Sequence, residues 1–365
     1  MKVLFVCTTG GSGRRQLGGA ERILTEIIPA HARTGVEVVA ATSDDEVGRS
    51  LREAGVPWVG LGAASRIDLT YARQIRRLAH EVQPDVVCAH LLSAAMHARA
   101  ALSMQRVRTP LVVTLHNSLW QYRDTAGSLR QKASIQSNIT LDLAMRRLRP
   151  HATVAVSEFE AAELRDRGRV ENVHLIPNPL PASWPGPRAA PRPGAGRRPV
   201  VGYLGRLERE KGADLLAEIA SYLPEADVKV AGAGSLPIAA RPNLELVGRV
   251  VAAEFLQRID CLVVPSRVES FGLSALEALS LGVPVVHTGA GGLAEVTRHA
   301  EGVLAFRAEP TPVALAGAVR EAIRRVDAPE DRRKVAEWYA DEYAFDRCVS
   351  RWQRLYRSLR RPVDQ

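Results

Sequence analysis

The sequence has few cysteines, and their spacing matches no metal-binding pattern. Its 365 residues include four, namely Cys7, Cys88, Cys261 and Cys348, all far apart in the chain. Three of them fall at or near the ends of predicted strands, which favours buried free thiols over disulfides. We therefore expect the protein in a reducing compartment, the cytoplasm.

Long apolar runs are also missing. No stretch approaches the ~20 apolar residues that a membrane-spanning helix needs. The apolar segment Val3–Val6 is too short for the core of a signal peptide, and polar, glycine-rich sequence follows it. We expect a cytoplasmic location, with peripheral contact at the inner face of the membrane left open.

Lysine is scarce, since 44 of the 49 basic residues are arginine and the net charge is +9. A basic surface attracts anionic lipid, nucleic acid or phosphorylated substrates. However, the basic residues are not interleaved with aromatic ones, and no nucleic-acid-binding motif is present. We expect no nucleic-acid partner.

The dinucleotide fingerprint is absent from the first strand–loop–helix unit. Residues 2–7 are predicted as a buried strand, 8–18 as a glycine-rich loop and 19–33 as a helix with an apolar stripe. This shape suits phosphate binding. Gly11 and Gly13 are not followed by a glycine at Gln16, so a nicotinamide-dependent dehydrogenase is disfavoured.

Apolar strands alternate with helices along the rest of the chain, which predicts parallel sheets covered on both faces. The proline- and glycine-rich stretch 181–199 interrupts this alternation and is predicted to be a linker between two α/β halves. The predicted strands are 36–41, 57–61, 85–89, 110–115 and 152–156 before the linker, and 200–204, 227–231, 244–247, 261–264 and 283–286 after it.

The stretch Pro265–Gly292 carries the most informative residues. Glu269 and Glu277 stand eight positions apart, around a loop that leads from a predicted strand into a predicted helix, 273–281. The start of that helix, near Phe271, offers backbone N–H groups and a positive dipole end to an anion. The glutamates suit hydroxyl groups better than phosphates, which points to a nucleotide or nucleotide sugar. The alternative interpretation is that Glu269 is a solvated loop residue and Glu277 an exposed helix residue.

This stretch resembles the E-x7-E motif of retaining glycosyltransferases with the GT-B fold, especially glycosyltransferase family 4. Further matches occur in the family's order over nearly the whole chain: 18–22 (GGAER), 114–116 (TLH), 156–158 (VSE), 176–178 (IPN), 205–207 (GRL), 211–212 (KG) and 231–234 (AGAG). The chain departs from the family at Pro179, where a glycine is usual, so the path between the two halves is open.

The resemblance implies two Rossmann-like domains with parallel sheets, which face each other across a cleft. We expect an N-terminal acceptor domain at 1–180, the linker at 181–199 and a nucleotide-sugar donor domain at 200–343. A last helix, within 344–361, is expected to cross back onto the first domain.

By resemblance, Arg206 and Lys211 bind the diphosphate, Glu269 contacts hydroxyls of the donor sugar, and Glu277 binds the ribose. Further donor-binding residues are expected at the loops that follow strands: Gly18, Gly19, Gly248, Arg249, Ser270, Phe271, Gly272 and Leu273. Among these, Gly248 and Arg249 would contact the nucleobase through the backbone. His116, at a predicted strand end, is expected to line the sugar or acceptor site, whereas His90 has no motif support and is interpreted as structural.

The implied reaction transfers a hexose-type sugar from a UDP- or GDP-sugar to an acceptor hydroxyl, with retention of configuration. The catalytic candidates are Glu269, His116, Arg206 and Lys211. No D-x-D triplet occurs, so we expect neither a metal nor another cofactor. The acceptor, a small molecule, glycan or lipid-linked group, is open. Two other functions are also open: a related epimerase or hydrolase of nucleotide sugars, and a non-catalytic sugar-nucleotide or glycan-binding protein.

Residues 128–149 are predicted as a helix with Ile135, Ile139, Met145 and Leu148 on it. Basic residues lie near its ends: Arg130, Lys132, Arg146, Arg147 and Arg149. The helix could face a membrane or an anionic acceptor. We favour the alternative, in which its apolar residues pack on the sheet and its basic residues are solvated.

Overall fold

The computed structural model describes residues 1–7, 19–42, 46–61, 68–103, 109–149, 151–187, 197–325 and 329–360. The chain divides into two compact units. The N-terminal unit consists of Met1–Pro181 and Phe345–Gln365, and the C-terminal unit of Ala182–Ala344. Within the expected linker, residues 181–187 and 197–199 form no helix or strand, and 188–196 lie outside the described residues.

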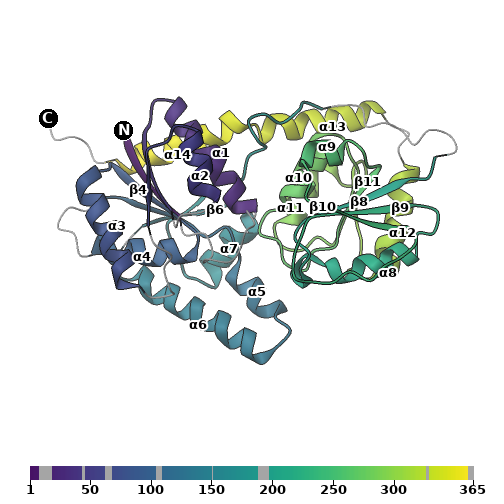
Figure 1. Cartoon of the computed structure of the whole chain (residues 1–365), viewed down its shortest axis with the longest axis horizontal. Coiled ribbons are helices and arrows are strands. Elements are labelled where there is room, and N and C mark those ends of the chain that lie inside the picture. Colours follow the sequence, from purple (N-terminus) through teal and green to yellow (C-terminus); the bar gives the residue numbers. More distant parts are fainter. Residues whose placement is uncertain are drawn as a thin grey trace. The chain divides into compact units, whose positions relative to one another are not determined.

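In the N-terminal unit, strands and helices alternate as predicted (Figure 1). The described strands pair in parallel in the order β3-β2-β1-β4-β5-β6-β7. They are β1 (Lys2–Cys7), β2 (Glu37–Thr42), β3 (Trp58–Gly60), β4 (Val86–His90), β5 (Leu111–Thr114), β6 (Ala152–Ala155) and β7 (Val173–Leu175). The helices are α1 (Gly19–Arg33), α2 (Glu46–Glu53), α3 (Leu69–Val82), α4 (Leu92–Ser103), α5 (Leu119–Thr125), α6 (Leu129–Arg146), α7 (Glu158–Asp166) and α14 (Phe345–Leu359).

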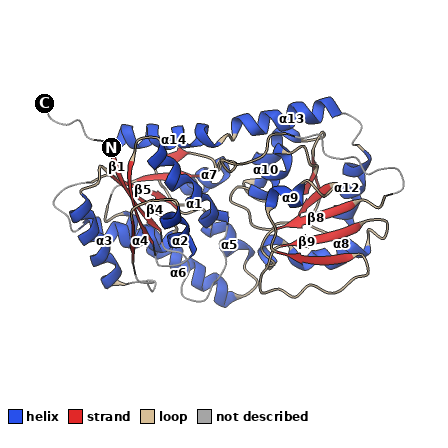
Figure 2. Ribbon diagram, turned by 45° about the horizontal axis from the view of Figure 1, so that its top comes forward, coloured by secondary structure: helices blue, strands red, loops and turns tan. Residues whose placement is uncertain are grey.

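Strand β1 shows why this sheet needs helices on both faces. Val3, Phe5 and Cys7 belong to one buried cluster, together with residues of α1 and α2. Leu4 and Val6 belong to a second cluster, together with residues of α3 and α4. Successive side chains of a strand point to opposite faces, so an apolar run is fully buried only between two layers of helices. Figure 2 shows the strands with helices around them.

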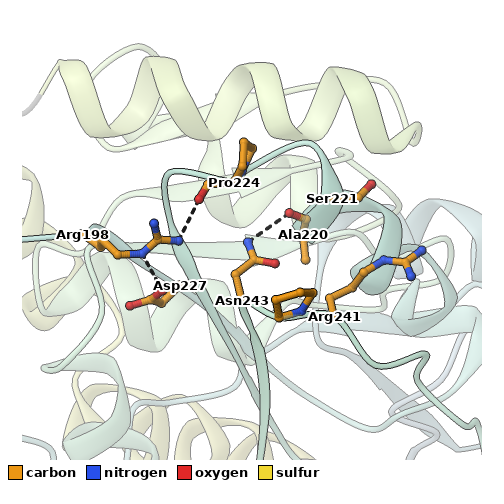
Figure 3. Close-up of a pocket in the computed structure, with 8 residues that line it drawn as sticks. Arg198, Ala220, Ser221, Pro224, Asp227, Arg241 and Asn243 are labelled. Atoms are coloured by element: carbon orange, nitrogen blue, oxygen red, sulfur yellow. Dashed lines mark hydrogen bonds and ion pairs between the residues drawn. The ribbon is translucent and has the colours of Figure 1, made fainter.

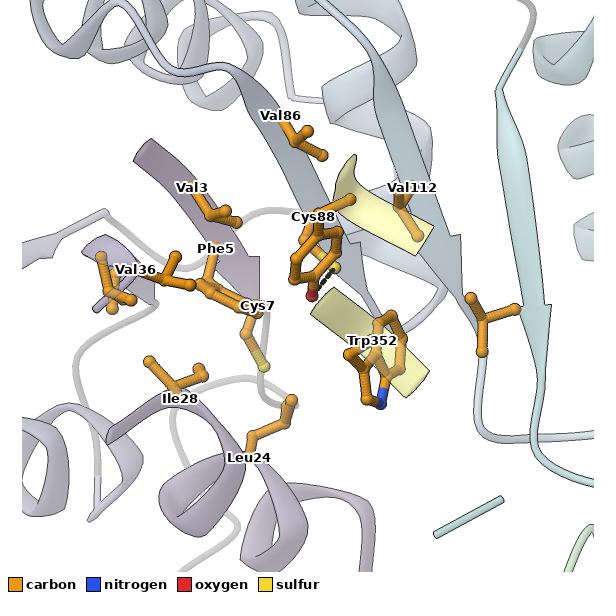
Figure 4. Close-up of a cluster of buried hydrophobic side chains, with 14 of the residues drawn as sticks. Val3, Phe5, Cys7, Leu24, Ile28, Val36, Val86, Cys88, Val112 and Trp352 are labelled. Atoms are coloured by element: carbon orange, nitrogen blue, oxygen red, sulfur yellow. Dashed lines mark hydrogen bonds between the residues drawn. The ribbon is translucent and has the colours of Figure 1, made fainter. Parts of the chain in front are cut away.

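Helix α14 comes from the end of the chain and completes the first of these clusters. Its Trp352, Leu355 and Tyr356 are at most 5% exposed and pack in the cluster of Val3 and Phe5 (Figure 4). The tail that was expected to cross back therefore packs on the N-terminal unit.

The C-terminal unit contains a second parallel sheet, in the order β10-β9-β8-β11-β12-β13. Its strands are β8 (Val200–Leu204), β9 (Asp227–Ala231), β10 (Leu244–Gly248), β11 (Cys261–Val264), β12 (Val285–His287) and β13 (Ala305–Arg307). Its helices are α8 (Leu216–Ser221), α9 (Ala252–Leu256), α10 (Leu273–Ser280), α11 (Leu293–Thr297), α12 (Pro312–Arg324) and α13 (Pro329–Glu342), with short 3-10 turns η1 (Arg209–Lys211), η2 (Ala213–Leu215) and η3 (Arg298–Ala300).

Two elements of this unit begin later than predicted. The sequence predicts a helix over 213–223, but this segment begins as the 3-10 turn η2 and becomes α-helical only at Leu216. Strand β12 begins at Val285 instead of Val283. Pro284 has no backbone N–H for a ladder hydrogen bond, which explains the later start.

Two basic residues near the end of α6 are neither solvated nor free for a membrane, so both interpretations of them are wrong. Asp142, which is 2% exposed, pairs with Arg146 at 2.7 Å and with the fully buried Arg99 at 2.5 Å. Arg149 donates to the backbone oxygens of Leu102 and Thr109 at 2.9 and 2.6 Å. Arg99 and Arg149 hold α6 and the residues after it to neighbouring segments of the N-terminal unit.

The start of α7 contains a buried carboxyl group. Ser157 caps the helix by accepting a hydrogen bond from the N–H of Glu160, and Glu160 Oε2 accepts from the N–H of Val156 at 2.8 Å. Glu160 is only 3% exposed. Burial raises the pKa of this carboxyl to about 7, although the Val156 N–H opposes the shift.

The raised pKa of Glu160 predicts a pH-dependent loss of stability. Between pH 4.5 and 7 the folded chain keeps a proton that the unfolded chain releases, so stability falls as pH rises and levels off above 7. Glu160→Gln keeps an acceptor for Val156 but does not titrate. Relative to this variant, the parent chain should lose on the order of 2 kcal/mol between pH 5 and pH 8. Urea midpoints at both pH values measure the difference, and an equal difference at both would contradict the shift.

Candidate active site

The order of strands in the C-terminal unit reverses at β8. From β8 the chain continues to β9 on one side and later to β11 on the other. The loops that leave β8 and β11 at their carboxyl ends therefore diverge, and ligands of open parallel sheets bind at such a point. Arg206 and Lys211 follow β8, and Glu269 follows β11.

These two loops come into close contact at Gly212. Its φ of 71° lies in the left-handed region, and a Cβ atom there would stand 2.0 Å from the backbone oxygen of Pro265. A side chain is thus excluded on two grounds. The backbone oxygen of Glu210 also accepts hydrogen bonds from the N–H groups of Arg267 and Val268 at 2.8 and 3.1 Å. Glycine at 212 lets the segment with Lys211 lie directly against the segment with Glu269.

Lys211 and Glu269 form an ion pair across these loops. Lys211 Nζ lies 2.7 Å from Glu269 Oε2 and 3.3 Å from the backbone oxygen of Val268. The hydroxyl of Ser266 lies 3.4 Å from the same carboxylate oxygen. The side chains of Lys211 and Glu269 are 21% and 14% exposed, so solvent screens the pair only in part.

Arg206 is more exposed than Lys211 and pairs with a different carboxylate, that of Glu210. Its Nη2 lies 3.0 Å from Glu210, and its side chain is 41% exposed. The hydroxyl of Tyr203, on β8, donates to the backbone oxygen of Arg206 at 2.6 Å. The four side chains of Arg206, Lys211, Glu210 and Glu269 carry no net charge together, so the region is less positive than the two cations alone would make it.

Helix α10 begins beside Glu269. Its N-cap is Gly272, with a φ of 107° and no side-chain capping bond. The N–H groups of a first helical turn, here from Leu273 onward, have no acceptor within the helix. The backbone oxygen of Glu269 accepts from the N–H of Gly292 at 2.9 Å, which ties this loop to the loop after β12. A helix amino end thus lies next to a carboxylate that is paired with lysine.

The remaining residues of the stretch 265–292 are largely buried. Phe271 is 4% exposed and its ring makes an edge contact with that of Tyr343, 5.8 Å between centroids. Ser270 is 8% exposed. Glu277, on α10, is 2% exposed, which excludes the alternative of an exposed helix residue. A buried carboxyl must be neutralised or hydrogen-bonded, so Glu277 is a constrained position.

Gly248 and Arg249 lie apart from this cluster. They stand at the carboxyl end of β10, which the strand order places two strands from β8. The backbone oxygen of Gly248 accepts from the N–H of Gly232 at 2.7 Å. Like Lys211, both residues lie at or after the carboxyl end of a strand, but their loop belongs to a strand further along the sheet.

In the N-terminal unit, His116 follows β5 and has a φ of 62°, which is unusual for a residue with a side chain. Its Nε2 lies 3.0 Å from Nδ1 of His90, at the end of β4. Burial lowers the pKa of His116 to about 4, so its imidazole is neutral at pH 7. Gly19 is the first residue of α1 and is exposed, whereas Gly18 lies outside the described residues.

Sequence reasoning missed Glu210, Ser266 and the contact of His90 with His116. Glu210 lies four positions after Arg206, a spacing that suits an ion pair in a helical turn. Ser266 follows Pro265 at the start of the glutamate stretch. His90 follows the predicted strand 85–89, but the sequence pattern does not give the order of strands that makes β4 and β5 neighbours.

A surface pocket of the C-terminal unit lies away from these residues (Figure 3). It is lined by Arg198, Asp227, Arg241 and Asn243 among others, near the amino ends of β8 and β9. Arg198 is bonded to Asp227 and to backbone oxygens, and Asn243 donates to three backbone oxygens. The polar groups of this pocket already have partners within the protein. The pocket lies at the amino ends of the strands, opposite the carboxyl ends that Lys211 and Glu269 follow.

No group of three or more His, Cys, Asp or Glu side chains among the described residues could hold a metal ion. No helix among the same residues has both the length and the apolar character needed to cross a membrane.

Family models match both halves of the chain. The model described as Glycosyltransferase Family 4 matches residues 17–184. The model described as Glycosyl transferases group 1 matches residues 198–325. The first match covers most of the N-terminal unit, and the second includes β8, Arg206, Lys211 and the whole stretch 265–292.

Curated relatives are similar over part of their length. The chain is 32% identical over 242 residues to a D-inositol 3-phosphate glycosyltransferase of Mycolicibacterium gilvum, a match that covers 57% of this chain and 52% of that protein. It is 34% identical over 280 residues to a glycogen synthase of Mycobacterium tuberculosis, covering 70% and 64%. The chain thus spans about half of the first relative and under two thirds of the second.

Solved structures resemble the chain over nearly its whole length. A sucrose-phosphate synthase from Thermosynechococcus elongatus has a TM-score of 0.79 at 18% identity, covering 98% of both chains. Anabaena HepE in complex with UDP has a TM-score of 0.77 at 20% identity, covering 98% of this chain and 99% of that one. At these identities the likeness shows that the chain shares their fold.

The geometry of Lys211 and Glu269 predicts energetic coupling between them. Lys211→Ala or Glu269→Ala alone should destabilise the chain, because each leaves a largely buried charge without its partner. The double variant should lose less than the sum, with a coupling of about 1–2 kcal/mol in urea unfolding. Arg333 and Glu337, a pair on α13 at 2.9 Å with side chains 62% and 49% exposed, provide the control. Additive effects at Lys211 and Glu269, as expected for the control, would show that the ion pair adds no stability.

Proposed function

We propose that this chain, a GT-B protein that resembles glycosyltransferase family 4, transfers a hexose-type sugar from a nucleoside diphosphate sugar to an acceptor hydroxyl. One observation chiefly supports this: the Lys211–Glu269 ion pair lies where the strand order reverses, beside the amino end of α10. A cation, a carboxylate and a helix amino end together suit a ligand that has both phosphates and hydroxyls. The likeness to a UDP-bound structure agrees with a UDP- or GDP-sugar.

We assign the diphosphate to Arg206, Lys211 and the first turn of α10. The ammonium of lysine has three N–H donors, and in Lys211 one points to Glu269 and one to the Val268 oxygen. It can therefore bind a phosphate oxygen without leaving Glu269. Arg206 can turn from Glu210 toward the phosphates because its side chain is 41% exposed. These donors would stabilise the charge that develops on the departing diphosphate.

We assign Glu269 to hydroxyls of the donor sugar and Glu277 to the ribose. The Oε2 atom of Glu269 contacts Lys211 and Ser266, and a carboxylate is an acceptor that suits hydroxyl donors. Glu277 is buried within the helix whose amino end we assign to phosphate, and a buried carboxylate binds hydroxyls strongly. Ser270, Phe271, Gly272 and Leu273 shape this loop, and Gly248 and Arg249 are assigned to the nucleobase.

In the N-terminal unit, His116 is assigned to the sugar or to the acceptor, and Gly18 and Gly19 to the donor. Retention of configuration belongs to the proposal as well. Product analysis with a panel of UDP- and GDP-hexoses, with and without candidate acceptors, tests the function. A glycoside with the donor's anomeric configuration is expected. Epimerised or hydrolysed donor without acceptor would instead identify an epimerase or hydrolase, and binding without turnover a binding protein.

Glu277→Gln should weaken the binding of UDP or GDP about 10- to 150-fold. A carboxylate that accepts ribose hydroxyls forms charge-assisted bonds worth about 1.5–3 kcal/mol, and their loss in the neutral amide corresponds to this range. Isothermal titration calorimetry measures the affinity. Glu321→Gln, at an exposed position of α12, is the matched control and should leave it unchanged. If Glu277→Gln binds as tightly as the parent chain, Glu277 does not contact the ribose.

Metal-independent transfer follows from the partner of Glu269. A divalent ion bound by this carboxylate would lie within a few ångströms of the Lys211 ammonium, 2.7 Å from Glu269. Like charges at that range repel, so the ion would have to displace lysine. We infer that Lys211, Arg206 and the helix amino end serve the diphosphate in place of a metal clamp.

Initial rates of transfer should therefore persist in excess EDTA. The assay compares rates before and after chelation, and again after magnesium or manganese is added back. The nucleotide affinity of the same samples, measured in parallel, controls for effects of the chelator on the protein. Complete loss of transfer in EDTA, with recovery on adding either ion, would mean that a carboxylate assigned to sugar recognition is a metal ligand.

A further inference from the structure

Four polar side chains form a continuous chain of contacts in the N-terminal unit. The Tyr356 hydroxyl, on α14, lies 3.5 Å from Cys88 Sγ on β4, a contact drawn as the dashed line at Cys88 in Figure 4. Cys88 Sγ lies 3.2 Å from His90 Nε2. His90 Nδ1 lies 3.0 Å from His116 Nε2. This chain of contacts thus leads from the C-terminal helix to His116, the histidine that we assign to the sugar or acceptor.

Burial keeps the members of this chain neutral. Tyr356 and Cys88 are 0% exposed and His90 is 1% exposed. Burial raises the pKa of Cys88 to about 12 and that of Tyr356 well above its usual range. It lowers the pKa of His90 well below its usual range, and that of His116 to about 4. Each group therefore carries one hydrogen that must find an acceptor inside the protein.

The positions of these hydrogens give the chain of contacts one direction, in which each group donates to the next from Tyr356 toward His116. The Tyr356 hydroxyl donates to Cys88 Sγ. The thiol then donates to His90 Nε2, its other neighbour in the chain. The hydrogen of neutral His90 must consequently be on Nδ1, where it donates to His116 Nε2. In the opposite direction the thiol would donate to the Tyr356 oxygen, and the hydrogen of the Tyr356 hydroxyl would have no acceptor among the described residues.

The hydrogen of His116 is consequently placed on Nδ1. That atom is buried and has no hydrogen-bond partner among the described residues. A buried donor without a partner is costly, and the positive φ of His116 adds backbone strain at the same residue. Both features are expected where a side chain is held ready for a ligand that is bound only part of the time.

We propose that Tyr356, Cys88 and His90 are positioning residues that hold His116 in its Nδ1–H tautomer, as a neutral hydrogen-bond donor to an oxygen of the sugar or acceptor. The use of this donor rests on the proposed function, whereas the tautomer does not. His90, interpreted from the sequence as structural, thereby becomes part of the site. The C-terminal helix also acquires a chemical role beyond packing, since Tyr356 sets the direction of the chain.

The tautomer is tested directly by nitrogen NMR of the full chain with 15N-labelled histidine, assigned with His116→Gln. In the parent chain, Nδ1 of His116 should be protonated and Nε2 unprotonated at pH 7. Cys88→Ala removes the thiol donor and should produce a mixture of tautomers. Cys88→Ser retains an O–H donor and should restore the parent pattern. Protonated Nε2 of His116 in the parent chain would overturn the proposal, whatever the activity of the protein.

Steady-state kinetics test the use of the donor. Cys88→Ala should lower kcat about tenfold, the lower end for residues that orient a catalytic group, with KM changed less than twofold. Cys88→Ser should recover most of kcat. Cys261→Ala is the matched control, since Cys261 is also fully buried but lies in the other unit, and should leave kcat unchanged. Equal losses for Cys88→Ala, Cys88→Ser and Cys261→Ala would indicate a general effect of core substitution and contradict positioning.

Discussion

The ion pair of Lys211 and Glu269 is the contact on which the candidate site of the C-terminal unit depends. It links the loops after β8 and β11, and the backbone bond from Gly292 to Glu269 adds the loop after β12. The carboxylate thus sits where the loops of three adjacent strands meet. Lys211 compensates the negative charge of Glu269 there, because water can solvate this largely buried carboxylate only in part. The tight approach at Gly212 permits this pairing, because a side chain there would clash with the backbone of Pro265.

The two units hold their candidate residues by different means. In the C-terminal unit, charges are paired at the rim of the sheet, where Lys211 and Glu269 keep some contact with water. In the N-terminal unit, Cys88, His90 and Tyr356 are buried, so charged forms are disfavoured and neutral hydrogen bonds replace ion pairs. The first arrangement suits a charged ligand group, and the second suits uncharged oxygens.

Helix α14 connects stability with chemistry in the N-terminal unit. Trp352 and Tyr356 fill the cluster around Phe5, and Trp352 also contacts the ring of His90 at 5.8 Å between centroids. Tyr356 and Cys88 touch although 268 positions separate them in the chain. The same helix therefore supplies both apolar burial and the first donor of the chain to His116, so a loss of α14 would affect both at once.

Local patterns in the sequence determined most of the elements. Strands β1, β8, β9 and β11 and helix α1 have the predicted bounds, because apolar runs and glycine or proline breaks are local signals. The same patterns placed Lys211, Glu269 and His116 at strand ends. Only the tertiary structure decided which segments meet: Lys211 pairs with Glu269, His90 with His116, and Arg99 with a buried Asp142. These contacts depend on strand order and on packing between distant segments, which spacing along the chain does not contain.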